Sequence, residues 1–166
     1  MDLIVELFRH NTMMNDRLVE ACQALSPDQL NSTVEGTYGK LGATLVHIAN
    51  SQHSYGSSLL ERERPERLSE DPFPGFEPLV ERFATGNALL EEAAAIGVQD
   101  RTVTVTGDDP VGSWTMPVSL FLVQALNHAT EHRSQIATIL TQLGVEPPPM
   151  DGWTFFFDGD HMTAVG

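Results

Sequence analysis

Residues 127–135 read Asn-His-Ala-Thr-Glu-His-Arg-Ser-Gln, and apolar residues recur at helical spacing before and after them. His128 and His132 are four positions apart, so a helix places both imidazoles on one face, about a turn apart. The apolar stripe includes this face, which predicts that both rings point into a core. The members of the stripe are Val118, Phe121, Leu122, Ala125, Ala129, Ile136, Ile139, Leu140 and Leu143.

A pair of inward imidazoles needs partners for both nitrogens of each ring. Histidines at this spacing can bind one divalent ion together. Two core histidines can equally be satisfied by neighbouring polar groups. The pair of His128 and His132 alone therefore leaves both interpretations open.

The chain is strongly acidic, with 23 Asp or Glu against 9 Lys or Arg among 166 residues and a formal net charge of -14. This charge repels phosphate backbones and anionic membrane surfaces, so we expect no nucleic-acid partner and no membrane. No apolar run approaches a membrane span, and no basic flank precedes a long apolar run at the N-terminus. The lone Cys22 cannot form an intramolecular disulfide, which fits a cytoplasmic protein. We expect a single domain over residues 1–166.

Three further segments are amphipathic at helical spacing, namely residues 2–24, 41–59 and 76–96. The histidine-bearing segment predicts a fourth helix, which Thr115 could cap and Gly144 ends. Four such helices predict an all-α fold, a four-helix bundle.

Shorter elements connect these helices. Residues 26–29, Ser-Pro-Asp-Gln, match a capping box that begins a short helical turn. Residues 102–106 alternate with period two and are β-branched, which predicts a short strand or extended connection before the last helix. The tail, residues 145–166, contains the apolar run 153–157 and should pack on the bundle or on a dimer partner.

His47 is the best candidate for a third ligand. It lies two positions after Leu45 and one before Ile48, at the buried face of the second helix, whereas His53 is less clearly inward. Helix bundles build metal sites from side chains on facing helices. Three neutral imidazoles leave a divalent ion with an open position, as in catalytic sites. The alternative is a closed structural site with a further ligand from the tail, from Asp158, Asp160 or His161.

Two other metal motifs fit less well. His128, Glu131 and His132 match the inverzincin pattern of metallopeptidases. However, Glu131 lies about 60° round a helix from His128, and Glu146 is the only later glutamate that could serve as third ligand. A ferritin-like site needs Glu three residues before His on two helices, and no histidine of this chain has one.

Four stretches together resemble the DinB/YfiT-like superfamily: Leu-Phe-Arg-His-Asn at 7–11, Leu-Ser-Pro-Asp-Gln-Leu at 25–30, Leu-Gly-Ala-Thr-Leu-Val-His-Ile at 41–48, and residues 127–135. The resemblance covers residues 3–150. It implies a four-helix bundle, often paired into homodimers. It also implies a divalent metal ion, nickel, zinc or iron, on the three histidines that map to His47, His128 and His132.

The resemblance also sets expectations for function. Characterised relatives include enzymes that use low-molecular-weight thiols such as mycothiol or bacillithiol, and others look like hydrolases. We therefore expect a metal-dependent enzyme acting on a small-molecule substrate, either a thiol-dependent S-transferase or isomerase, or a hydrolase. A non-catalytic metal-binding or ligand-binding bundle and a bundle with purely structural histidines are the alternatives.

The candidate pocket-lining residues are His10, Asn11, Gln52 and Glu131. Three of them depart from the family pattern: Glu131 replaces a histidine, Gln52 an acidic residue and His10 an aromatic ring. An inward Glu131 would favour water activation, whereas a basic side chain beside the pocket, such as Arg133, would favour an anionic thiol.

Overall fold

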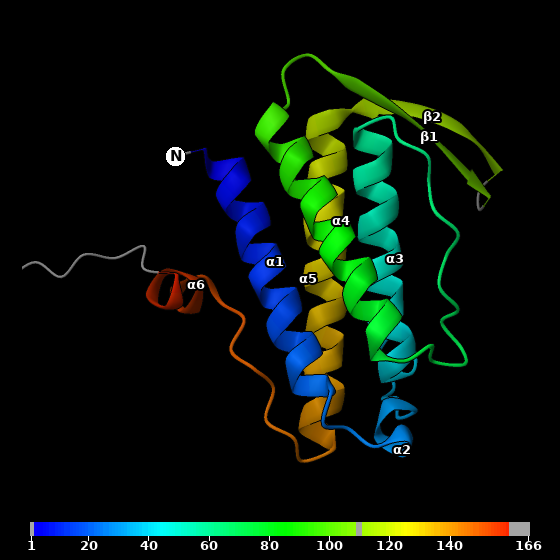
Figure 1. Cartoon of the computed structure of the whole chain (residues 1–166), viewed down its shortest axis with the longest axis vertical. Coiled ribbons are helices and arrows are strands. Elements are labelled where there is room, and N and C mark those ends of the chain that lie inside the picture. The colour runs from blue at the N-terminus through cyan, green and yellow to red at the C-terminus, as the bar shows by residue number, and fades with distance from the viewer. Residues whose placement is uncertain (1, 109–110, 160–166) are drawn as a thin grey trace, which may run out of the picture.

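The computed structural model describes residues 2–108 and 111–159, and in this part of the chain four long helices run side by side (Figure 1). They are α1 (Leu3–Cys22), α3 (Leu41–Leu59), α4 (Phe76–Ile96) and α5 (Val118–Gln142). Helix α3 packs against α4 and α5, and α1 packs against the same two helices. The predicted all-α four-helix bundle is confirmed.

The core consists of two apolar clusters stacked along the bundle. One cluster surrounds Leu45 and Ile136 and contains Cys22, and the other surrounds Phe8 and Leu122. The buried members of α5 repeat the apolar stripe read from the sequence, from Val118 to Leu140. This agreement arises because burial in a bundle selects positions on one face of each helix.

Two glycines allow α3 and α4 to approach closely. A Cβ added at Gly56 of α3 would lie only 2.5 Å from the Cβ of Leu89 on α4. A Cβ added at Gly86 of α4 would lie 3.0 Å from the backbone nitrogen of His53 on α3. The backbones of these helices are therefore in near contact at both points.

The capping box at Ser26 is confirmed, and it begins α2 (Pro27–Leu30). The backbone N–H of Gln29 donates to Ser26 Oγ (3.3 Å), and the backbone N–H of Ser26 donates to Gln29 Oε1 (2.9 Å). After α2 the chain crosses to α3, where the N–H of Leu41 donates to the carbonyl of Ser32. This loop contains Tyr38, three residues before the first residue of α3.

The extended connection is a β-hairpin of β1 (Thr102–Asp108) and β2 (Val111–Pro117), at one end of the bundle (Figure 1). The prediction that Thr115 caps the last helix is wrong. Thr115 instead pairs with Thr104 across the hairpin, with their hydroxyl oxygens 3.0 Å apart. Helix α5 begins after Pro117, and the N–H of Val118 donates to the carbonyl of Arg101.

The tail forms a last short helix, α6 (Gly152–Asp158), which lies beside α1 (Figure 1). Phe155 is buried there and meets the ring of His10 edge-on, with centroids 5.5 Å apart. Asp158, considered above as a metal ligand, forms an ion pair with Arg17 of α1. Asp160 and His161 lie outside the described residues. Pairing into a homodimer stays a prediction.

None of the helices described between residues 2 and 159 combines the length and the apolar character that crossing a bilayer requires.

Candidate metal centre

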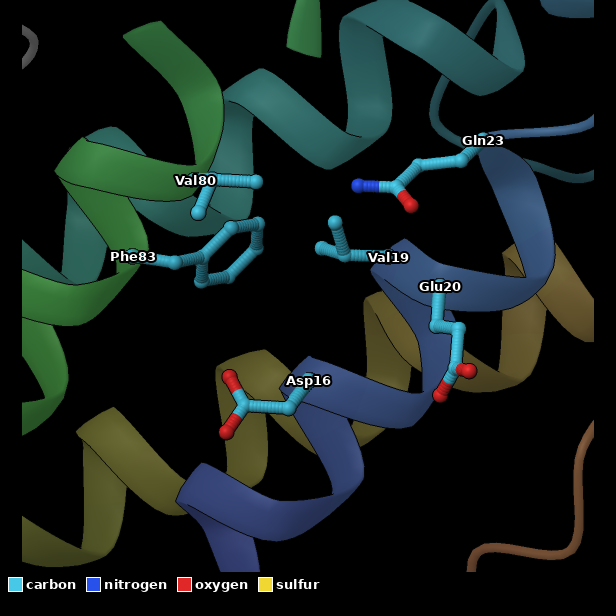
Figure 2. Close-up of a pocket in the computed structure, with 6 residues that line it drawn as sticks. All are labelled: Asp16, Val19, Glu20, Gln23, Val80 and Phe83. Atoms are coloured by element: carbon cyan, nitrogen blue, oxygen red, sulfur yellow. The ribbon is translucent and has the colours of Figure 1, made fainter. Parts of the chain in front are cut away.

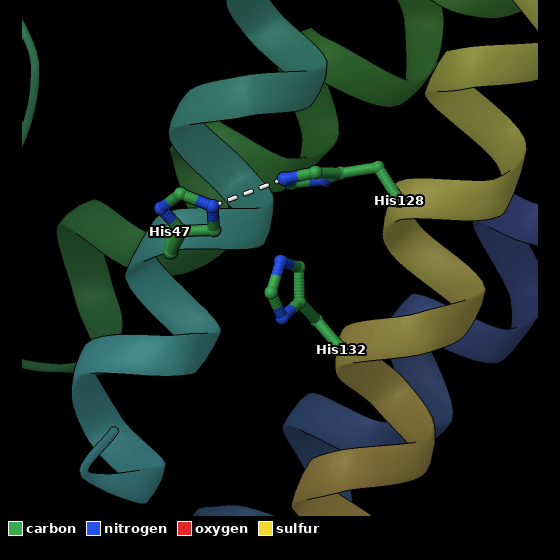
Figure 3. A group of neighbouring side chains, drawn as sticks. All are labelled: His47, His128 and His132. Carbon is green, nitrogen blue, oxygen red and sulfur yellow. Dashed lines mark hydrogen bonds between the residues drawn. The ribbon is translucent and has the colours of Figure 1, made fainter. Parts of the chain in front are cut away.

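Three histidines from two helices meet at one point between α3 and α5. Each of His47, His128 and His132 offers one nitrogen, and these atoms all lie within 4.8 Å of one another. The closest pair is Nε2 of His47 and Nε2 of His128, which are 3.0 Å apart. Figure 3 shows the three rings turned toward one another across the gap between the two helices. The structure therefore brings together all three histidines singled out from the sequence.

The local helical geometry explains this arrangement. The spacing of four residues stacks His128 and His132 on one face of α5, with ring centroids 4.5 Å apart. His47 projects from α3 between the buried Val46 and Ile48 and reaches both rings at 4.9 Å. Packing of α3 on α5 thus completes the group.

Hydrogen bonds to the outer nitrogens set the tautomers of two rings. His47 Nδ1 donates to Glu70 Oε1 (3.2 Å), and His132 Nδ1 donates to Gln135 Oε1 (2.9 Å). Both acceptors are oxygens, so the hydrogen of each ring is on Nδ1. The Nε2 lone pairs of His47 and His132 are then left to face His128.

Gln135 and Glu70 are themselves held by Tyr38. The backbone N–H of Tyr38 donates to Gln135 Oε1 (3.1 Å), and the Tyr38 hydroxyl donates to Glu70 Oε2 (3.0 Å). The Tyr38 ring lies over His47 with centroids 4.1 Å apart, and it forms a T-shaped pair with His132 with centroids 5.0 Å apart. One exposed aromatic residue thus covers two of the histidines.

Burial favours the neutral form of the His47 and His128 imidazoles. Burial lowers the pKa of His128 to about 3, with further contributions from His132, His47 and Arg67. Burial also lowers the pKa of His47, although the hydrogen bond to Glu70 opposes this. A neutral imidazole is the form that binds a metal ion.

Glu70 stays ionised beside these neutral rings. Burial raises the pKa of the Glu70 carboxyl, but hydrogen bonds from Arg67, His47 and Tyr38 outweigh that effect and hold the pKa below its usual value. A charged carboxylate therefore accepts the Nδ1 hydrogen of His47.

The donor set fits a divalent ion. Two imidazole nitrogens bound to one tetrahedral ion at about 2.0–2.1 Å are about 3.3 Å apart, close to the 3.0 Å between the Nε2 atoms of His47 and His128. Without an ion, His128 Nε2 must carry the hydrogen in this contact. Its buried Nδ1 would then be an acceptor with no hydrogen-bond partner among the described residues. An ion between the rings removes the need for that proton.

Asn11 and Gln52 belong to a separate buried polar network centred on Arg133. Arg133 Nη1 donates to Asn11 Oδ1 (2.6 Å) and Asn15 Oδ1 (2.8 Å), and Asn15 Nδ2 donates to Gln52 Oε1 and Asn87 Oδ1, both at 3.0 Å. The described residues place no carboxylate on Arg133, and burial lowers its pKa to about 10. These side chains connect all four long helices.

The other two candidate pocket residues also lie apart from the histidine cluster. His10 is half-buried against Phe155 of the tail, and its pKa is lowered chiefly by burial. Glu131 is exposed on α5, as its angular offset from His128 predicts. Neither side chain joins the group of nitrogens that meet between α3 and α5.

A separate hollow of about 330 Å³ lies between α1 and α4 (Figure 2). Asp16 and Val19 of α1 lie opposite Val80 and Phe83 of α4 across it. Burial and the nearby Glu91 raise the pKa of Asp16. Within residues 2–108 and 111–159, only the three histidines form a group of metal-ligating side chains, so this hollow holds no comparable donor set.

Three residues that shape the histidine cluster were missed from the sequence. Gln135 is part of the quoted stretch and lies three positions after His132, a spacing that puts both on one face. Tyr38 and Glu70 lie on loops, where no periodicity marks them. An aromatic ring within the polar stretch 31–40 was the available signal for Tyr38.

Comparisons with known proteins agree with this fold. The sequence model of the DinB family matches residues 1–158. A crystal structure of a DinB-like protein from Bacillus cereus ATCC 10987 superposes with a TM-score of 0.67 at 18% identity, covering 88% of this chain and 94% of that one. No curated protein matches the chain significantly.

Proposed function

Because the chain belongs to the DinB family, we propose that it is a metal-dependent enzyme that binds one divalent ion through His47, His128 and His132. The observation that carries this proposal is the meeting of three imidazole nitrogens within 4.8 Å. The bond from His47 to Glu70 and the bond from His132 to Gln135 leave two Nε2 lone pairs for the ion. Nickel, zinc and iron all accept such ligands.

Three protein ligands leave an ion open to a further group. When bound, a divalent ion supplies positive charge that lowers the pKa of a thiol or of water placed at that position. We propose that the substrate is a small molecule and that a low-molecular-weight thiol is the co-substrate, as in an S-transferase or isomerase. Hydrolysis of a small molecule is the alternative reaction.

The residues around the histidines favour the thiol over water. Glu131 is exposed rather than inward, so it supports no general-base role at the histidines. Arg133 is buried and bound to Asn11 and Asn15, so it is not a cation for the pocket. Arg67 is the cation whose charge reaches the histidines, where it adds a small lowering to the pKa of both His47 and His128 while also bonding to Glu70. A cation beside the site favours an anionic ligand such as a thiolate.

The chain supplies no nucleophile of its own at this site within the described residues. Cys22 is fully buried in the apolar core, and burial raises its pKa to about 12. The three histidines are occupied as ligands. The roles left to the protein are to hold the ion, to keep His47 and His128 neutral by burial, and to cover His47 and His132 with Tyr38.

Metal analysis tests the site first. Wild-type protein, desalted after exposure to zinc, nickel or cobalt, should retain about one ion per chain, and the double variant His128→Ala, His132→Ala should retain none. Equal metal in both proteins would reject the site.

Spectroscopy and activity assays then test the reaction class. The absorption spectrum of the cobalt form should change when small thiols are added. An unchanged spectrum together with turnover of an ester or amide would replace the transferase by a hydrolase. Bound metal without activity in either assay would favour the non-catalytic binding bundle.

A further inference from the structure

We infer that Glu70 is the positioning residue of the histidine site, fixing the tautomer and the direction of His47 from a loop outside the bundle. This inference rests on the proposed metal site. Glu70 is 23 positions away from His47 in the chain, on the connection between α3 and α4.

Glu70 acts on the nitrogen of His47 that faces away from the other histidines. His47 Nδ1 donates to Glu70 Oε1 at 3.2 Å, while His47 Nε2 lies 3.0 Å from His128 Nε2. A carboxylate at Nδ1 keeps the ring hydrogen there and raises the electron density at Nε2, which strengthens that atom as a ligand. Without this acceptor the hydrogen can move to Nε2, and the ring can rotate about its side chain.

Both oxygens of Glu70 are engaged, so the carboxylate has a fixed direction. Oε1 accepts from His47 and from Arg67 Nη2 (2.8 Å), and Oε2 accepts from the Tyr38 hydroxyl (3.0 Å). Rotation of the carboxylate would break the bond to Tyr38 or the bonds to His47 and Arg67. A carboxylate fixed in this way can orient an imidazole.

The loop that carries Glu70 is itself anchored to α3. The buried side chain of Asn50 donates through Nδ2 to the carbonyl of Leu68 (2.9 Å), and its Oδ1 accepts from the backbone N–H of Leu68 (3.0 Å). Asn50 is three positions after His47, about one helical turn away. The anchor and the histidine therefore move together, which keeps Glu70 in register with its ring.

The three histidines differ in this outer support. His132 has the neutral oxygen of Gln135 from its own helix, and Nδ1 of His128 has no hydrogen-bond partner among residues 2–108 and 111–159. Glu70 is the one carboxylate that bonds to the cluster in that part of the chain. Its loss should therefore weaken metal binding more than a change at Gln135.

Titration of zinc or cobalt into metal-free protein tests this inference. Replacing Glu70 by Ala should weaken binding by about 10-fold to 100-fold, the usual effect of removing such an outer partner. The change Glu70→Gln keeps an acceptor oxygen at the same distance and should restore part of the affinity. The visible absorption bands of the cobalt form should shift in Glu70→Ala and return toward wild type in Glu70→Gln, because they report the geometry of the ligands.

Two control variants separate the role of Glu70 from general effects of charge and loop structure. Glu66→Ala removes a glutamate carboxylate from an exposed position four residues before Glu70. It should leave the affinity for the metal unchanged within about twofold. Tyr38→Phe keeps the ring over His47 but removes the hydroxyl, so it should weaken binding less than Glu70→Ala. Circular dichroism confirms that each variant is folded, and Glu70→Gln serves if Glu70→Ala is not.

A parallel titration of His47→Ala distinguishes the two ways to fail. Loss of binding in His47→Ala with wild-type affinity and cobalt spectrum in both Glu70 variants would overturn the role of Glu70 and leave the metal site intact. Equal binding by wild type and His47→Ala would overturn the site itself.

Discussion

The Nε2 atoms of His47 and His128 lie 3.0 Å apart, although the two residues belong to different helices and are 81 positions apart in the chain. At that distance two bare lone pairs repel, so either a proton or a cation must lie between them. The hydrogen of His47 is already committed to Glu70. The contact is therefore sensitive to protonation when no ion is present.

The metal-free protein should lose stability as the pH falls from about 6.5 to 5. Burial is the main cause that lowers the pKa of His128 in the folded protein to about 3, against 6.5 for a free histidine side chain. Between these values the unfolded chain binds more protons than the folded one, so the free energy of unfolding rises with pH and becomes flat above about 7. At pH 5 one such histidine costs roughly 2 kcal/mol.

Urea unfolding of chelator-treated protein across this pH range measures the effect. The matched variant His128→Asn lacks the titrating ring, so its stability should fall less steeply with acidification. Identical slopes for the two proteins would contradict the lowered pKa of His128.

Removal of the metal should leave the helices intact. Two apolar clusters along four long helices stabilise the bundle without help from the histidines. The far-ultraviolet circular dichroism should not change on adding chelator, whereas the midpoint of thermal unfolding should rise with metal. An ion at about a hundred times its Kd adds roughly 3 kcal/mol. Collapse of the helical signal in chelator would instead assign the metal a structural role.

Cys22 should be inert in the native protein. Its thiol is fully buried, and burial raises its pKa to about 12. At pH 8 only about one molecule in ten thousand would carry the reactive thiolate. A chromogenic disulfide reagent should therefore detect about one thiol per chain in protein unfolded by guanidinium, and almost none in the folded protein. Rapid stoichiometric reaction of the folded protein would show that this part of the core opens.

Gly56→Ala should destabilise the bundle by about 2 kcal/mol, because the new methyl group would press on Leu89 and the backbone of α4. The gain in helix propensity offsets only part of this strain. Gly39→Ala is the control, since no atom lies within 4 Å of a Cβ at that position. Urea unfolding measures the stability of both variants. Equal stabilities would show that α3 and α4 can move apart to accommodate the methyl group.

Asn15→Ala should lower the free energy of unfolding by about 3 kcal/mol. The buried guanidinium of Arg133 loses one acceptor, and the side-chain oxygens of Gln52 and Asn87 lose the donor that they share. The control Glu20→Ala, at an exposed position of the same helix, should change stability by less than about 0.5 kcal/mol. A similar small effect at both positions would show that the network around Arg133 is not cooperative.

The helices and the histidine cluster were predictable because both depend on periodicity. A stripe at helical spacing specifies which face of α5 is buried, and that face contains His128 and His132. His47 followed from the same argument on α3. Local signals were equally informative at Ser26, where the capping box needs only residues within one turn.

The parts that were missed depend on partners distant in the chain. Residues 111–117 contain a glycine and a proline and lack an alternating pattern, so β2 is defined by its pairing with β1. Thr115 is a residue type that is common at helix N-caps, but its hydroxyl is hydrogen-bonded to the hydroxyl of Thr104 on the facing strand. Glu70 reaches His47 only because Asn50 holds its loop, and no spacing in the sequence encodes that contact.

The network around Arg133 has a consequence for how the four helices align along the bundle axis. Apolar stripes tolerate sliding of one helix along another, since the hydrophobic effect has no direction. Arg133 can only donate hydrogen bonds, so Asn15 must turn its oxygen toward α5 and its nitrogen toward Gln52 and Asn87 on α3 and α4. A shift of one helix by a turn would separate these groups and leave a buried guanidinium without its acceptors, at a cost of several kcal/mol. The polar core thus fixes an axial alignment that the apolar surfaces alone would leave loosely defined.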